Sequence, residues 1–256
     1  MTDIFPSFTS SHPFGFGSFF VTMSPMKTAF KKILYRKKVA IDTKKPGPKF
    51  IVLEGGEGSG KSTLMIALKE MFGDKIITTR EPGGSPYAEL IRSVTIKTPL
   101  AKTTPTETTL CLMFASRFDN LKNLIKPALD AGTHVISDRF DASSYTYQVH
   151  SQSGGTLDKL FWELRARMEV VPDLYIFIDV EPREGIRRAS HRNQALNLGK
   201  EYDHFDDREI AFHEKVRQGY KKFFKKVPHI VIDGNKSLNV VKEEFIKKVG
   251  EVLGDN

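Results

Sequence analysis

The stretch FIVLEGGEGSGKST occupies residues 50–63 and decides the fold prediction. Apolar and β-branched residues lead into a glycine-rich turn, and an apolar pattern of helical period follows it. Within the stretch Gly55, Gly60, Lys61 and Ser62 fit G-x-x-x-x-G-K-[ST], with a strand before the motif and a helix after it. A glycine-rich turn without any ligand is the alternative. The complete match with both flanking elements instead predicts a nucleotide phosphate site.

Each part of this loop has an expected role toward the phosphates. Glycines let successive backbone N–H groups turn toward anionic oxygens, and the helix N-terminus adds a positive dipole end. Lys61 would reach the β- and γ-phosphates, and the Ser62 hydroxyl would bind Mg²⁺. The loop residues expected at the ATP phosphates are Gly55, Gly56, Glu57, Gly58, Ser59, Gly60, Lys61, Ser62 and Thr63.

The composition describes a soluble globular protein of a reducing compartment such as the cytoplasm. The 256 residues suffice for one large α/β domain or two small ones. No apolar run reaches the roughly eighteen residues that a membrane span needs. The single cysteine, Cys111, excludes an internal disulfide. It lies in the run LCLMF and is predicted to fill part of the core.

The net charge of +8 is concentrated at the N-terminus. Residues 1–48 hold eight lysines and arginines against two aspartates, whereas the remainder holds 31 basic and 29 acidic residues. The basic character therefore predicts no nucleic-acid surface on the folded body. Three interpretations of this extension stay open: a disordered tail, an organelle transit peptide, or a translation start at Met23 or Met26.

From residue 49 onward, predicted strands and helices alternate. Buried strands are expected over 50–54, 75–79, 134–138, 174–179 and 229–233. Helical patterns are expected over 61–72, 85–97, 106–131, 156–169, 205–226 and 236–252. Short apolar strands separated by amphipathic helices predict an α/β fold with a parallel sheet covered on both faces.

Two further stretches follow predicted strands and could hold a second ligand at the carboxyl edge of the sheet. TREPGG (79–84) combines a tight turn with Arg80 and Glu81. In SDRFDASSYTYQ (137–148), Asp138 could bind Mg²⁺ or its water, and Arg139 could hold a phosphate through two hydrogen bonds. A plain turn and a local charge pair are the structural alternatives.

Residues 185–207 are basic first and then acidic, with few apolar side chains, and they interrupt two helical patterns. This composition is typical of a mobile flap whose arginines close over a nucleotide and exclude water. A solvated charged loop is the alternative, and it would be preferred if this segment stood alone.

Together these stretches resemble the thymidylate kinase family of bacteria and phages. The motifs that carry the resemblance are LEGGEGSGKST, TREPGGSP, MFASRFDNLKNLIKPAL, ISDRFDASSYTYQ, PDLYIFIDVEP and HEKVRQGY. The resemblance implies a P-loop NTPase fold over residues 49–256, with a five-stranded parallel sheet and a mobile lid over about 187–207. It further implies Mg²⁺-dependent transfer of the γ-phosphoryl group of ATP to dTMP by a homodimer that binds neither nucleic acid nor membrane.

The resemblance also implies residue roles. Arg117 matches the arginine that hydrogen-bonds and stacks on thymine, Arg139 the one that holds the acceptor phosphate, and Tyr147 the ring that crowds the 2′ side of the sugar. The implied dTMP site is Glu57, Arg80, Pro82, Phe114, Arg117, Arg139, Ser143, Ser144 and Tyr147. The implied catalytic residues are Lys61, Arg139, Arg188 and Arg192, with Arg187 also in the lid, and the implied Mg²⁺ ligands are Ser62, Glu57 and Asp138.

Three positions depart from the family pattern. Met113 replaces the phenylalanine that usually stacks on thymine, with Phe114 following it, and Ser190 replaces a lid arginine. The D-R-[FI]-E motif becomes Asp203-His204-Phe205-Asp206. These departures concern base specificity and lid chemistry rather than phosphoryl transfer.

The sequence therefore predicts a dTMP kinase, with three alternatives. Met113 motivates a kinase of broader deoxynucleoside monophosphate specificity. A non-catalytic nucleotide-binding module tethered by the basic residues 27–45 is a second alternative. A nucleoside kinase is the third, although Arg139 would then lack a phosphate to hold.

Overall fold

The computed structural model describes residues 47–195 and 210–254. The extension predicted over 1–48 therefore lies outside the described residues up to position 46. The same holds for the second half of the charged segment and its Asp203-His204-Phe205-Asp206 motif.

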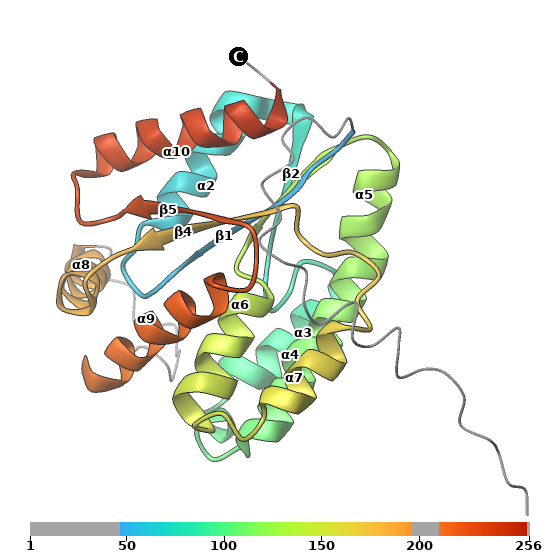
Figure 1. Cartoon of the computed structure of the whole chain (residues 1–256), viewed down its shortest axis with the longest axis vertical. Coiled ribbons are helices and arrows are strands. Elements are labelled where there is room, and N and C mark those ends of the chain that lie inside the picture. The colour runs from blue at the N-terminus through green and yellow to red at the C-terminus, as the bar shows by residue number, and fades with distance from the viewer. Residues whose placement is uncertain (1–46, 196–209, 255–256) are drawn as a thin grey trace, which may run out of the picture.

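All five predicted strands form, and they make one parallel sheet in the order β2-β3-β1-β4-β5 (Figure 1). Their bounds are β1 (Phe50–Gly55), β2 (Ile76–Arg80), β3 (His134–Asp138), β4 (Leu174–Asp179) and β5 (His229–Asp233). In register, Leu53 of β1 pairs with Asp138 of β3 and with Ile176 of β4. The residues after the ends of these strands therefore meet at one edge of the sheet.

Helices cover both faces of the sheet, as predicted. They are α2 (Lys61–Phe72), α3 (Pro86–Ile96), α4 (Thr106–Asn120), α5 (Lys126–Asp130), α6 (Asp141–Ser144), α7 (Asp158–Arg165), α8 (Pro182–Ala195), α9 (Ile210–Phe224) and α10 (Leu238–Leu253). Two short 3-10 turns, η1 (Gly73–Lys75) and η2 (Pro99–Lys102), and two π-helical segments, η3 (Leu121–Ile125) and η4 (Tyr145–Gln152), complete the described elements. None of the helices described over 47–195 and 210–254 has the length and apolar character to cross a membrane.

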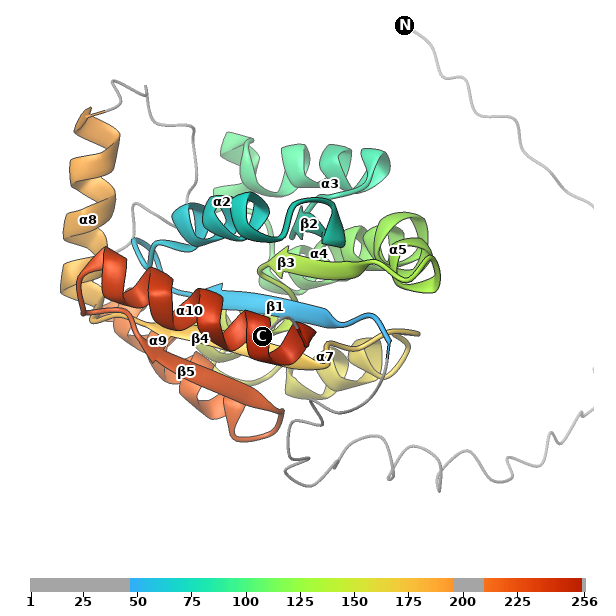
Figure 2. The same ribbon diagram turned by 90° about the horizontal axis from the view of Figure 1, so that it is seen from above.

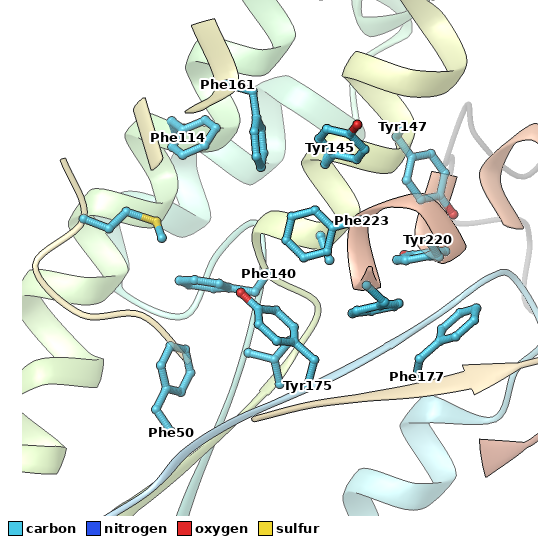
Figure 3. Close-up of a cluster of buried hydrophobic side chains, with 14 of the residues drawn as sticks. Phe50, Phe114, Phe140, Tyr145, Tyr147, Phe161, Tyr175, Phe177, Tyr220 and Phe223 are labelled. Atoms are coloured by element: carbon cyan, nitrogen blue, oxygen red, sulfur yellow. The ribbon is translucent and has the colours of Figure 1, made fainter. Parts of the chain in front are cut away.

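The strands alternate between two hydrophobic cores, one on each face. Phe50 and Val52 of β1 point into a core shared with α4, η4, α7 and α9, whereas Ile51 and Leu53 pack against α2 and α10. The first core is rich in aromatic rings (Figure 3), and the Phe50 and Phe140 rings meet edge to face with centroids 5.1 Å apart. Phe140 comes two residues after the end of β3 and directly after Arg139. This core therefore fixes the chain at the carboxyl end of β3.

Three regions differ from the prediction. The charged segment begins as helix α8, because Glu184 forms ion pairs with Arg187 and Arg188 one turn away. Residues 141–152 are helical as well, through α6 and η4, whereas no helix is predicted there. Cys111 is exposed rather than in the core, because the buried face of α4 carries Leu110 and other residues one and two turns on.

Figure 2 views the sheet from above and shows α8 beyond the edge to which β1 points, away from the layers of helices on the two faces. The helix follows β4, so its position places several arginines next to the glycine-rich loop after β1.

Candidate functional site

The glycine-rich loop is closed by the side chain of Lys61, the first residue of α2. Its ammonium donates to the carbonyl oxygens of Gly55 and Gly56, both at 3.0 Å, and to Ser59 Oγ at 3.1 Å. Burial, followed by the nearby positive charge of Arg139, lowers the pKa of Lys61 to about 8. The carbonyl groups at the start of the loop thus hold the lysine beside the loop N–H groups that can bind an anion.

A cavity, here called the loop cavity, lies between this loop, the start of α10 and α8. Most of the residues predicted at the ATP phosphates line it, from Glu57 to Thr63, and so do Asp138, Arg139 and the α8 residues Arg187, Arg188 and Arg192. Gly55 and Gly56 do not line it, and their carbonyl oxygens instead accept hydrogen bonds from Lys61. Its far side, which the sequence prediction missed, consists of Gly234, Lys236, Ser237, Leu238 and Val241.

The three α8 arginines that line the loop cavity have different contacts. Arg187 is bound to Glu184 through two hydrogen bonds. Arg188 is shared between Glu184 and the carbonyl oxygen of Gly234, which its Nη1 reaches at 2.7 Å. Arg192 extends to the phosphate loop, with its Nη2 3.3 Å from Glu57 Oε1. Arg192 therefore lies nearest to the loop residues.

Helix α8 meets the phosphate loop backbone against backbone. A Cβ built on Gly58 would lie 1.9 Å from the carbonyl oxygen of Gly185, and one built on Gly185 would lie 2.3 Å from that of Glu57. Gly58 also has a φ of +62°, which disfavours any side chain. Only glycine therefore fits at either position.

The residues predicted to bind Mg²⁺ suit that ion. Asp138 Oδ1 is buried without a hydrogen-bond partner in the described part of the chain, and Asp138, Glu57 and Ser62 all line the loop cavity. Residues 47–195 and 210–254 contain no cluster of three or more acidic, histidine or cysteine ligands. This arrangement fits Mg²⁺, which usually takes one or two carboxylates together with substrate phosphates.

A second cavity, here called the inner cavity, lies between β3, α3, α4 and the α6–η4 segment. Seven of the nine residues predicted at dTMP line it: Glu57, Pro82, Arg117, Arg139, Ser143, Ser144 and Tyr147. The other wall residues are Glu81, Arg92, Ile96, Met113, Phe140 and Gln148. Met113, which departs from the family pattern, therefore does stand in the wall of this cavity.

Arg117 is buried and held on several sides. Its Nε donates to Glu81 Oε2 at 2.7 Å, and its Nη2 donates to Ser144 Oγ at 2.9 Å. Its guanidinium carbon lies 4.5 Å from the ring centre of Phe114 and 4.9 Å from that of Phe140. Nη1 has no hydrogen-bond partner within the described residues, so it remains for a carbonyl group in the cavity. Burial, opposed by Arg117, raises the pKa of Glu81 to about 7.

Two predicted residues do not reach the inner cavity. Arg80 turns to Glu89, with Nη2 3.0 Å from Oε2, and lies on the other side of β2 beside Ser62 and Asp138. Phe114 is buried beneath the guanidinium of Arg117 and acts through it. Neither residue lines the inner cavity.

Sequence reasoning missed Arg92 and Ile96 because they belong to no quoted motif. It gave no role to Glu81, Phe140 and Gln148, although they stand in quoted motifs. Arg92 reaches the cavity from α3 and donates to the carbonyl oxygen of Pro82 at 2.9 Å. Glu81 stands inside the quoted stretch 79–84, yet only the fold shows that its partner is Arg117. Arg92 could have been found from its helical phase, because it lies one turn before the buried Ile96, which lines the same cavity.

Comparisons with known proteins identify the family and agree with the fold. The family model described as thymidylate kinase matches residues 53–245. A thymidylate kinase of Idiomarina loihiensis is 38% identical over 211 residues, covering 80% of this chain and 98% of that protein. A thymidylate kinase of Marinomonas sp. is 41% identical over 214 residues, covering 79% and 96%. The crystal structure of thymidylate kinase from Ehrlichia chaffeensis superposes with a TM-score of 0.59 at 29% identity, covering 80% of this chain and 99% of that one.

Proposed function

The chain belongs to the thymidylate kinase family, which phosphorylates dTMP to dTDP with ATP, and we propose how its two cavities divide this reaction. ATP occupies the loop cavity with its phosphates on the glycine-rich loop, and dTMP occupies the inner cavity. The observation that carries the assignment is that Glu57 and Arg139 line both cavities. The donor and acceptor phosphates therefore meet beside these two side chains, where positioning and charge stabilisation can act on the transfer.

On the donor side, Lys61 and the loop amides hold the β- and γ-phosphates. Arg192 is the α8 arginine that neutralises the transferring group, because it already reaches Glu57, whereas Arg188 is bound to Glu184 and Gly234. Asp138, Ser62 and Glu57 would hold Mg²⁺, which supplies charge neutralisation at the phosphate oxygens when bound.

On the acceptor side, Arg139 binds the phosphate of dTMP, and Arg117 donates from Nη1 to a carbonyl oxygen of the thymine. The ring of Tyr147 lies below Arg139, 5.6 Å from its guanidinium carbon, and limits the space beside the sugar. Met113 packs along the base in place of an aromatic ring, since a thioether makes favourable contacts with ring systems.

A panel of acceptors tests this assignment. With Mg·ATP, we expect release of ADP with dTMP and more slowly with dUMP, and little with dCMP, dGMP or dAMP. The discrimination should weaken in Arg117→Lys, whose side chain cannot keep the contacts to Glu81 and Ser144 together. Similar rates with several bases in the native chain would favour the kinase of broader specificity that Met113 motivates.

We also propose that the chain forms a homodimer through the β2 edge of the sheet. Residues of α2, β2 and α3 border one hollow there, and these elements carry exposed apolar side chains: Ile66, Met71, Ile77, Tyr87, Leu90 and Val94. An apolar surface that spans three elements is typical of a protein interface. Light scattering should give about twice 28.9 kDa for the native chain and for a Val231→Glu control, but the monomer mass for Leu90→Glu/Val94→Glu.

A further inference from the structure

The carboxyl group of Glu54, next to the phosphate loop on β1, is fully buried, and none of the assigned roles uses it. Four donors surround it. Oε1 accepts from the backbone N–H groups of Phe140 at 2.9 Å and Ser143 at 3.1 Å. Oε2 accepts from Ser143 Oγ at 2.7 Å and from the Tyr220 hydroxyl at 3.0 Å. Burial raises the pKa of Glu54 to about 6, and Arg139 and these hydrogen bonds oppose that rise. The carboxyl group also fixes the groups that donate to it.

The same donors also hold Arg139, both along its backbone and at its guanidinium. This residue has a φ of +68°, the left-handed region that side chains adopt at a cost, and no other non-glycine residue of the described ranges has a positive φ. The bonds from Phe140 and Ser143 to Glu54 hold the chain directly after it. The backbone N–H of Arg139 donates to the carbonyl oxygen of Leu53, the neighbour of Glu54. Residues Leu53 and Glu54 of β1 therefore fix the backbone conformation at Arg139.

The same hydroxyls also contact the Arg139 guanidinium. Nη1 lies 3.2 Å from Ser143 Oγ and 3.1 Å from the Tyr220 hydroxyl, and it donates to the carbonyl oxygen of Gly55 at 3.2 Å. The two hydroxyl oxygens also lie 2.9 Å from each other. When both hydroxyls donate to the Glu54 carboxylate, both oxygens present lone pairs to Nη1. Within the described residues Arg139 makes its hydrogen bonds through Nη1, so Nε and Nη2 remain for a phosphate, a geometry that suits bidentate contact.

We propose that Glu54 is a positioning residue for dTMP binding: through Ser143 and Tyr220 it holds Nη1 of Arg139, so that Nε and Nη2 face the acceptor phosphate. Ser143 accordingly acts in the implied dTMP site through this network. The inference rests on the proposed binding of the acceptor phosphate by Arg139. Tyr220 brings α9 into the same network. Residues of β1, α6 and α9, which are distant in the chain, therefore fix the position of one guanidinium.

Glu54→Gln tests the proposal because it keeps the side-chain volume but replaces one acceptor oxygen by a donor. In the full chain we expect KM for dTMP to rise about ten- to a hundredfold, the effect of losing hydrogen bonds to a charged group, while KM for ATP stays within about twofold. Tyr220→Phe, which removes one donor, should raise KM for dTMP by about three- to tenfold. A KM for dTMP within about twofold of the native value in both variants would overturn the proposal.

Tyr175→Phe is the matched control. Tyr175 is also buried, and its hydroxyl donates to a buried carboxylate, Asp141 Oδ1, at 2.6 Å, but it lines neither cavity. We expect a lower melting temperature and an unchanged KM for dTMP. If Glu54→Gln does not fold, Tyr220→Phe and Ser143→Ala decide the question. An Arg139→Ala variant with native KM for dTMP would refute the phosphate assignment itself, whereas a raised KM there with native values in Glu54→Gln and Tyr220→Phe would refute only the role of Glu54.

Discussion

The loop cavity and the inner cavity are built in opposite ways. The loop cavity is formed mainly by the glycine-rich loop and the charged helix α8, with residues at the carboxyl end of β3 and at the start of α10 completing its wall, and its α8 arginines are partly exposed. The inner cavity depends on two buried carboxylates, Glu54 and Glu81, that hold two arginines from other elements. A site made by a local backbone conformation tolerates change around it. A site made by interlocked buried charges depends on every member, because an unpaired buried charge is costly.

The largest effect should come from Lys61, on which the loop cavity depends. We expect Lys61→Ala to lower kcat by roughly 10²–10³-fold, because it removes a cation from the phosphate site. ADP release measured at saturating dTMP reports this loss. Lys69→Ala serves as the control, since Lys69 lies on the same helix and is half exposed. An Lys61→Ala chain that turns over at the native rate would contradict the assignment of this cavity to ATP.

The next effect concerns stability and belongs to the inner cavity. Arg117→Met should lower the free energy of unfolding by about 3–5 kcal/mol, because the carboxylate of Glu81 stays buried without its partner. Adding Glu81→Gln should recover much of that loss. Urea unfolding of the two single variants and the double variant measures the coupling. Strictly additive losses would show that the pair does not act as a unit.

These two regions also differ in how far the sequence predicts them. The phosphate loop and the parallel sheet were predicted because motif, strand and helix are adjacent in the chain. The carboxylates were not assigned, because Glu54 and Tyr220 stand 166 positions apart and only the fold joins them. Arg80 stands at the end of β2, as predicted, but its ion pair with Glu89, which the sequence pattern does not show, directs its side chain away from the inner cavity.

Helix α8 could have been predicted from the spacing of its charged residues, although its composition suggests a loop. The segment is rich in charges and was therefore predicted as a flap. The Glu184, Arg187 and Arg188 spacing of three and four residues is nevertheless the pattern that supports a helix. Cys111 shows the opposite kind of error. Its neighbours in the sequence are apolar, which predicts burial, yet it lies on the exposed face of α4.

A smaller effect on rate would test which α8 arginine acts in the loop cavity. We expect Arg192→Ala to lower kcat by about 10²-fold, with a smaller change in KM for dTMP, because the charge stabilises the transferring group. Arg183→Ala is the matched control, since Arg183 is exposed on the same helix and lines neither cavity. A larger loss in Arg188→Ala than in Arg192→Ala would transfer the role to Arg188.

The smallest effect is the pH dependence of the inner cavity. Burial raises the pKa of Glu81 from 4.5 to about 7, so the folded chain holds this proton more tightly than the unfolded chain. The resulting stabilisation is complete below about pH 4.5 and is lost as the pH rises through about 7. The free energy of unfolding of the native chain, relative to Glu81→Gln, should therefore be higher at about pH 5 than at about pH 8. A constant difference across this range would show that Glu81 does not titrate there.

The contact between Gly58 and Gly185 has a consequence for how such a chain can diverge. A first mutation at either position adds an atom where the opposite backbone already stands, so it separates the phosphate loop from α8 before any second mutation could compensate. Because each position excludes side chains on account of the other, neither can drift alone. We expect lineages of this enzyme to keep both glycines through changes that alter the residues around them freely.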